Sequence, residues 1–311
     1  SHSSISSSDV IRKIFIIALG LSLPLAMGEA YLQVVDPYHY GENEDWTQYG
    51  SKIMDQSKGQ LRPGAKATYL ARPTVISRQG WRSPEFEPQK PTDVYRILVV
   101  GGSVPYGWGV AEGDEFPRIL ERELNARRYA GDKRVEVINT GVPGWNLPEV
   151  ARLLQGEAFT WQPDMVMLLL VATDVPRTQP ASRSFWLSTT MRRCRLLRAI
   201  ENRYVFGTPG SGGRPSDAYE NLPEDGLTVV AEALALFAGA CREHSAEPVV
   251  IDTLNSGITR KRCVGLGLHR VEAYTNWALR RSWEGALTDA HPNAAGHRHY
   301  ADLILANLPK R

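Results

Sequence analysis

The residues best suited to chemistry are a serine in a glycine-rich turn and an Asp–His pair near the carboxyl end of the chain. Ser103 follows Gly101 and Gly102, and Asp289 lies two positions before His291. A serine hydroxyl becomes a nucleophile when a histidine within hydrogen-bond reach takes its proton and a carboxylate orients that histidine. Because the three residue types occur in the order Ser, Asp, His, the sequence predicts a serine-nucleophile site.

A buried strand is needed to position Ser103. Residues 96–100 are mostly apolar and β-favouring, which is typical of a strand inside a parallel sheet. A serine that directly follows such a strand lies at the carboxyl edge of the sheet, where open α/β sheets bind ligands. The neighbouring glycines let a substrate approach main-chain N–H groups, although a plain strand–turn connection would also explain them. Gly141, after a second predicted strand at residues 135–139, could give such an N–H to an oxyanion.

The middle of the chain alternates strands and helices. We predict further strands at residues 165–171 and 247–252 and helices at 115–128, 147–161 and 227–244. Repeated βα units predict a parallel sheet with right-handed crossovers and helices on both faces. The domain is expected over residues 93–311, with an insertion at about 176–222. No acidic residue occurs from Val175 to Ile200, whereas six arginines lie in this stretch: Arg177, Arg183, Arg192, Arg193, Arg195 and Arg198.

The arginine-rich insertion has three interpretations. It is either a solvated basic helix, a lid over the site, or a surface for anionic lipid headgroups or a partner subunit.

The first 92 residues divide into three predicted segments: a polar tail at 1–9, an apolar segment at 10–35 and an irregular extension at 36–92. The 14 residues from Ile14 to Met27 carry no charge, and the apolar character resumes after Glu29. A retained membrane anchor and a cleaved secretory signal both fit this pattern, and we favour the anchor. Since Arg12 and Lys13 precede the apolar run, the main domain is expected outside the cytoplasm, in the periplasm. Glu29 hints at a helix–helix contact in the membrane.

Composition limits the classes of protein. The 311 residues have a net charge of +2, which is too small to argue for a nucleic-acid partner. Cys194, Cys241 and Cys263 form no CxxC pair and no metal-ligand spacing, and which of them pair is left open. We therefore expect no metal and no cofactor. In the extension, Trp46 and Trp81 are expected to pack rather than to bind ligand.

Four blocks together resemble the SGNH hydrolase family, also called GDSL-type esterases. They are the Gly-Gly-Ser turn, the downstream Gly141, the residues after the third strand, and the His-Pro-Asn-Ala-Ala-Gly-His ending that begins at His291. The apolar amino-terminal segment and the Gly-Trp-Arg turn at residues 80–82 resemble the membrane-anchored bacterial branch. The resemblance implies a three-layer α/β/α sandwich with a flavodoxin-like, mostly parallel five-stranded sheet.

The resemblance also implies roles for residues. Ser103 would be the nucleophile and an oxyanion donor, Gly141 a second donor, His291 the base and later the acid, and Asp289 its orienting group. This sequence departs from the family pattern at Gly102, where the family often has Asp, and at Thr288, three positions before His291, where the family has its acid. Thr173 stands where the family has the asparagine that donates its side-chain amide to the oxyanion. A threonine hydroxyl is a shorter donor.

Two functions follow from these observations. One is a membrane-anchored extracytoplasmic esterase that acts through an acyl-enzyme, with acylated envelope polysaccharide or lipid as substrate. Trp108 and Trp145 flank the predicted pocket, where they either line it or pack. The other function is that of a catalytically weak or inactive SGNH-fold accessory subunit of a membrane complex. Thr173, Glu29 and the arginine-rich insertion favour the second.

Overall fold

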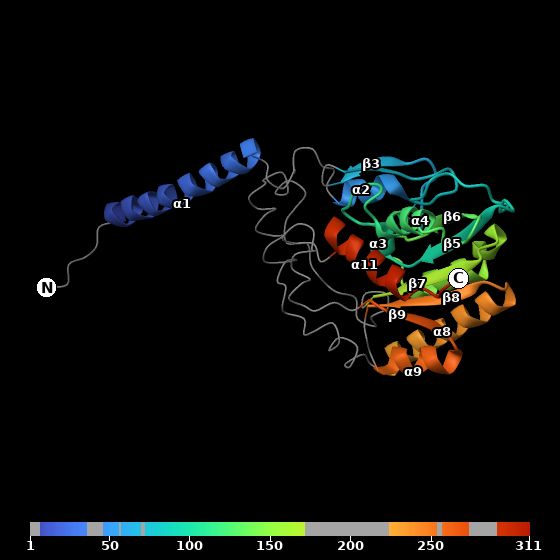
Figure 1. Ribbon diagram of the computed structural model, residues 1–311. Coiled ribbons are helices and arrows are strands. Elements are labelled where there is room, and N and C mark those ends of the chain that lie inside the picture. Colours follow the sequence, from blue (N-terminus) through green and yellow to red (C-terminus); the bar gives the residue numbers. More distant parts are fainter. Residues whose placement is uncertain are drawn as a thin grey trace.

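A five-stranded parallel sheet forms the centre of the molecule (Figure 1). The computed structural model describes residues 7–35, 46–55, 57–69, 72–171, 224–253, 257–273 and 291–311. The strands are β5 (Val94–Val100), β6 (Arg134–Asn139), β7 (Met165–Leu170), β8 (Glu247–Asp252) and β9 (His269–Glu272), in the order β6-β5-β7-β8-β9. All four pairings are parallel. This is the flavodoxin-like strand order. The chain adds β6 on one side of β5 and then crosses over to add β7, β8 and β9 on the other side.

Apolar side chains alternate between the two faces of this sheet, and each face packs against helices. Ile97 and Val99 belong to one core cluster, which includes side chains of α4 (Phe116–Ala126) and α11 (Ala294–Asn307). Leu98 and Val100 belong to the other cluster, which includes side chains of α5 (Leu147–Gln155), α8 (Glu224–Glu243) and α9 (Gly257–Leu266). The three-layer α/β/α architecture is therefore confirmed.

The predicted strands and helices are largely confirmed, and the structure differs from the prediction where the sequence pattern is weak. The four predicted strands form, and the helix expected over 147–161 is α5 followed by a short 3-10 helix, η1 (Ala158–Trp161). Gly156 caps α5, which explains the break. The residues of β9 and α9 were not predicted, because β9 has four residues and α9 carries three consecutive basic residues at positions 260–262 without an apolar stripe.

The extension contains more regular structure than expected. It holds α2 (Trp46–Ile53), a hairpin of β1 (Met54–Asp55) with β2 (Gln60–Leu61), and an antiparallel pair of β3 (Lys66–Tyr69) with β4 (Arg72–Val75). Tyr49, Ile53 and Trp81 are buried and belong to the same core cluster as α5 and α8. Trp81 makes edge contacts with Trp145 and Trp161, so its predicted packing role is confirmed.

The amino-terminal segment is helical but does not qualify as a membrane span. The helix α1 (Ser7–Val35) has Pro24 inside it and lies apart from the sheet (Figure 1). Among the residues that the structure describes, no helix is both long and apolar enough to cross a bilayer. The transmembrane anchor predicted over residues 10–35 is thus not found. That prediction rested on the uncharged run of 14 residues, which alone is shorter than the ~20 that a spanning helix requires, together with the apolar residues after Glu29.

Candidate active site

Ser103 lies where the chain leaves β5 at the carboxyl edge of the sheet. Gly101 and Gly102 turn the chain, and Ser103 is the first residue of a one-turn helix, α3 (Ser103–Tyr106). Gly101 adopts φ 154°, and a side chain there would come within 2.9 Å of Pro105 Cγ. The strand has β6 on one side and β7 on the other, so Ser103 stands at the point where ligands bind in this topology.

His291 is brought to Ser103 from the other end of the chain. The distance from its Nε2 to Ser103 Oγ is 2.7 Å, across a separation of 188 residues. The start of α11 sets the position of His291, because Asn293 caps that helix by accepting a hydrogen bond from the Gly296 N–H at 3.1 Å. This geometry is what a histidine base needs in order to take the serine proton.

Two of the predicted site residues lie outside the described residues. These are Asp289 and Thr173, so the orienting acid and the third oxyanion donor stay predictions. The arginine-rich insertion and Cys194 also lie outside them. Within the ranges that the structure does describe, no group of three or more His, Cys, Asp or Glu could hold a metal ion.

Gly141 lies beside the nucleophile turn, but its N–H is already used. It donates to Asn139 Oδ1 at 3.0 Å, while Asn139 Nδ2 donates to the Pro105 carbonyl at 2.7 Å. A Cβ at Gly141 would lie 2.3 Å from the backbone nitrogen of Tyr106. In this structure Gly141 therefore provides close packing of two loops, and its N–H is not available to an oxyanion as predicted.

Gly144, three residues further along the same loop, has the properties expected of a donor. It is exposed, it adopts φ 84°, and its N–H has no hydrogen-bond partner among the described residues. The N–H of Ser103 is likewise unpartnered there, since it is the first residue of α3. Sequence reasoning missed Gly144, although it follows Pro143 in the same loop after the second strand.

The two tryptophans expected near the pocket have different surroundings. Trp108 is half-buried, and its ring centroid lies 6.0 Å from that of His291. It also contacts Tyr49 and Tyr69 of the extension at 5.3 and 5.0 Å between ring centroids. Trp145 is buried in the core, where its Nε1 donates to the Gly59 carbonyl. Of these two tryptophans, Trp108 is therefore the one that contacts the Ser103–His291 pair in the described part of the chain.

Three buried polar residues near the nucleophile turn, Arg82, Glu115 and His297, were not predicted as part of the site. Arg82 donates to carbonyls of the loop that follows Ser103. Burial raises the pKa of the Glu115 carboxyl to about 7, although Arg82 opposes this rise. Burial also lowers the pKa of His297 to about 3, with Arg82 and His291 acting in the same direction. The Gly-Trp-Arg turn was the signal for Arg82, and His297 is the last residue of the His-Pro-Asn-Ala-Ala-Gly-His ending, whereas Glu115 looks like an ordinary helix residue in the sequence.

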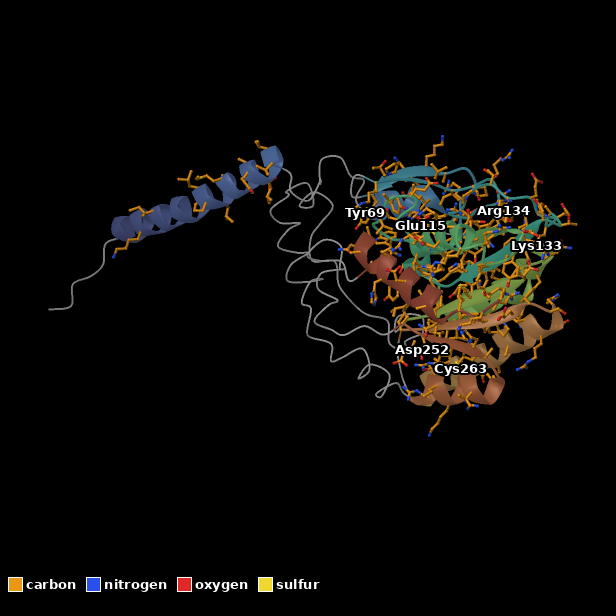
Figure 2. All side chains as sticks on the ribbon, viewed as in Figure 1. Tyr69, Glu115, Lys133, Arg134, Asp252 and Cys263 are labelled. Atoms are coloured by element: carbon orange, nitrogen blue, oxygen red, sulfur yellow. The ribbon has the colours of Figure 1, made fainter. Side chains whose placement is uncertain are left out.

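A second buried carboxylate, Asp252, is structural. It accepts hydrogen bonds from Thr259 Oγ1 at 2.6 Å and from Arg270 Nε at 2.7 Å, which ties β8 to α9 and β9. Figure 2 shows Asp252 and Cys263 together, on the opposite side of the molecule from Glu115 and Tyr69. Cys241 and Cys263 are both buried and free, and burial raises the pKa of Cys241 to about 12 and of Cys263 to about 11. Neither thiol is suited to nucleophilic chemistry.

Comparisons with solved structures find similar folds at low identity. The psychrotrophic esterase EstA from Pseudoalteromonas sp. is 12% identical over 68% of this chain and 96% of its own, with a TM-score of 0.46. A variant of Axe2, an acetyl-xylooligosaccharide esterase from Geobacillus stearothermophilus, is 14% identical over 68% and 93%, with a TM-score of 0.44. These likenesses are too low to support an argument about chemistry. No curated protein sequence matches this chain.

The family is shown by the sequence model of the GDSL-like lipase/acylhydrolase family. That model matches residues 99–299, which include the nucleophile turn and the histidine that contacts it. The match spans well over half of the chain and agrees with the parallel sheet and with the pairing of Ser103 and His291. The chain belongs to the GDSL-like lipase/acylhydrolase family.

Proposed function

We propose that this protein is a serine esterase that works through an acyl-enzyme, with Ser103 as nucleophile and His291 as base. The observation that carries the proposal is the 2.7 Å contact between His291 Nε2 and Ser103 Oγ. His291 accepts the Ser103 proton while Oγ bonds to the ester carbonyl carbon. It then gives the proton to the leaving alkoxide as the ester C–O bond breaks. In the second half, His291 accepts a proton from water as the water oxygen bonds to the acyl carbon, and it returns that proton to Ser103 Oγ as the acyl–Oγ bond breaks and the acid leaves.

The negative charge that develops on the carbonyl oxygen needs donors close to Oγ. We assign this role to the N–H groups of Ser103 and Gly144, because both are unpartnered among the described residues. Asp289 completes the proposal as the group that orients His291, and Thr173 as a shorter substitute for the family's asparagine. Loss of one oxyanion donor typically lowers the rate by about 10²–10³. A modest kcat is therefore expected.

The site is tested with a fluorophosphonate probe on the folded, full-length chain. We expect labelling at Ser103 that is lost in Ser103→Ala and in His291→Ala, together with hydrolysis of p-nitrophenyl acetate. Ser57→Ala and His269→Ala are matched controls, since Ser57 is exposed in the turn between β1 and β2 and the half-buried His269 begins β9. They should label as the wild type does. Folded wild-type protein that neither labels nor hydrolyses the ester would contradict the proposal and favour an accessory role.

We further infer a membrane-attached, extracytoplasmic protein whose substrates are acyl esters of envelope polysaccharide or lipid. The support is the order of residues in the first 35 positions, where Arg12 and Lys13 precede an uncharged run. Membrane fractionation of bacteria that express the full chain, compared with a chain that begins at residue 46, tests this location. Equal recovery of both chains in the soluble fraction would rule out attachment by this segment.

A further inference from the structure

We propose that Arg82 is a positioning residue for the nucleophile. Its guanidinium enters from the extension and holds the loop over residues 103–110, which we call the nucleophile loop. This inference rests on the proposed esterase function, because it concerns how that same serine is held. Among the described residues, the hydrogen bonds and the ring contact of Arg82 go to Tyr106, Gly107 and Val110 and not to Ser103 or His291, so Arg82 acts through the loop.

The hydrogen bonds of Arg82 all go to backbone carbonyls of this loop. Nη1 donates to the carbonyls of Tyr106, at 3.2 Å, and Gly107, and Nη2 donates to the carbonyl of Val110 at 2.7 Å. The guanidinium carbon also lies 5.0 Å from the centroid of the Tyr106 ring. Arg82 is only 2% exposed. A planar guanidinium can bind several carbonyls at once in a fixed geometry, which a lysine ammonium cannot do.

Arg82 binds the part of the nucleophile loop that regular secondary structure does not hold, whereas Asn139 holds the Pro105 carbonyl nearer to Ser103. The helix α3 is a single turn, and its last carbonyls have no continuing helix to bind them. Gly107 and Gly109 adopt φ 85° and 75°, and glycine gives the unfolded loop extra conformational freedom. Arg82 binds the carbonyls at this end of α3, where a cation is favoured.

Two residues of the nucleophile loop contribute to the site. Ser103 begins the loop, and Trp108, within it, packs against the ring of His291 at 6.0 Å. A shift of the loop would therefore change the distance between the nucleophile and its base. The exposed Arg72 adds a contact from the same extension, with Nη1 donating to the Gly109 carbonyl at 2.6 Å.

The space around Arg82 is closed: both Nη atoms are hydrogen-bonded, and the buried Nε has no hydrogen-bond partner among the described residues. A Cβ at Gly107 would lie 2.6 Å from Glu115 Cβ and 3.2 Å from Arg82 Nη1, so glycine is required for the three groups to meet. Glu115 lies where α4 and the extension come together (Figure 2), and its carboxyl is the acidic group whose pKa Arg82 lowers. Hydrogen bonds from a buried cation are stronger than those between neutral groups. The Arg82 guanidinium is thus buried, and its hydrogen bonds are assisted by its charge.

Arg96 provides a matched control within the same domain. It is fully buried in β5 and also donates to three backbone carbonyls, those of Glu87, Pro88 and Trp161. None of these carbonyls belongs to the nucleophile loop. Arg96 Nε also pairs with Glu136 at 2.7 Å, so Arg96→Gln removes at least as much buried contact as Arg82→Gln, and removes it away from the nucleophile loop.

The test compares Arg82→Gln, Arg82→Lys and Arg96→Gln with the wild type. Urea unfolding gives the folded fraction, steady-state hydrolysis of p-nitrophenyl acetate gives kcat and KM, and amide hydrogen exchange is followed in peptides covering residues 101–111. For Arg82→Gln we expect a kcat lower by about tenfold to a hundredfold per folded molecule, a KM within about threefold of the wild type, and faster exchange in the loop. The kcat of Arg82→Lys should lie between those of the wild type and Arg82→Gln. A further variant, Arg82→Ala, should regain part of its kcat when guanidinium ion is added.

Arg96→Gln should lose stability while its kcat per folded molecule and the exchange of residues 101–111 stay at the wild-type level. Wild-type kcat and exchange in Arg82→Gln would overturn the inference, and so would an equal change of both in Arg96→Gln. If Arg82→Gln does not fold, the same criteria apply to Arg82→Lys. A folded wild type without esterase activity would refute the proposed function, and the exchange data would still decide whether Arg82 holds the loop.

Discussion

At Gly141 the backbone after β6 approaches the turn after β5 so closely that no side chain fits between them. The nearest atoms to a Cβ placed there are backbone atoms of Tyr106 and Pro105, at 2.3 and 2.9 Å. Asn139 joins the same two segments, since its side chain binds the Gly141 N–H and the Pro105 carbonyl. These contacts fix the spacing between the nucleophile turn and the loop that carries Gly144.

Gly141→Ala should therefore destabilise the protein. We expect a loss of about 1–3 kcal/mol in the free energy of unfolding, because the added methyl group must displace backbone. Gly50→Ala is the control, as Gly50 lies in α2 with nothing within 4 Å of an added Cβ. It should be neutral or slightly stabilising. Urea unfolding measures both, and equal stability of the two variants would show that the loops can separate at no cost.

The helix α11 places His291 through its first turn. Asn293 is its N-cap, and His291 precedes that cap by two residues, so the direction in which the helix begins determines where the imidazole lies. The body of α11 is held against α4 and the sheet by Ala301 and Ile304. On the other side of the site, the extension contributes Arg82, Tyr49 and Tyr69 around the nucleophile loop. Elements from both ends of the chain thus meet at Ser103.

Asn293→Ala should lower the free energy of unfolding by about 1 kcal/mol, because the Gly296 N–H loses its side-chain acceptor. Asn293→Ser keeps an acceptor at the cap and should retain most of that stability. Urea unfolding at one pH compares the three proteins. A loss in Asn293→Ser as large as that in Asn293→Ala would mean that the cap hydrogen bond is not the cause.

The stability of the whole molecule combines two buried groups with opposite responses to pH. The pKa of Glu115 is about 7 in the folded protein against 4.5 as its ordinary value, so its burial costs stability as pH rises from about 4.5 to 7. The pKa of His297 is about 3 in the folded protein against 6.5, so its burial costs stability as pH falls from about 6.5 to 3. Between pH 5 and 7 the two contributions nearly cancel.

Replacing either group should reveal the pH dependence of the free energy of unfolding that the other group causes. From pH 5 to pH 7, the free energy of unfolding of Glu115→Gln should rise by about 2 kcal/mol relative to the wild type. That of His297→Gln should fall relative to the wild type by about 2 kcal/mol over the same interval. Urea unfolding at pH 5, 6 and 7 measures these differences. If the free energy of unfolding of both variants changes with pH as that of the wild type does, the shifted pKa values of Glu115 and His297 are contradicted.

Local sequence patterns determine much of this protein. Apolar runs at residues 96–100, 135–139, 165–171 and 247–252 predict four of the five strands, since burial on both faces selects continuous apolar residues. The glycine turn and the His-Pro-Asn segment mark Ser103 and His291, because a turn and a helix start have local signatures. The short strand β9 and the regular structure of the extension lacked such signatures.

Only the tertiary structure decides how these segments meet. Contacts that shape the site join residues far apart: Arg82 with Tyr106 across 24 residues, Asn139 with Pro105 across 34, and the Phe116 N–H with His297 across 181. No local pattern predicts such a pairing, because each partner is an ordinary residue until folding removes it from water. Burial then makes an unpaired polar group costly, and that cost holds Arg82 on the nucleophile loop and gives Glu115 and His297 their shifted pKa values.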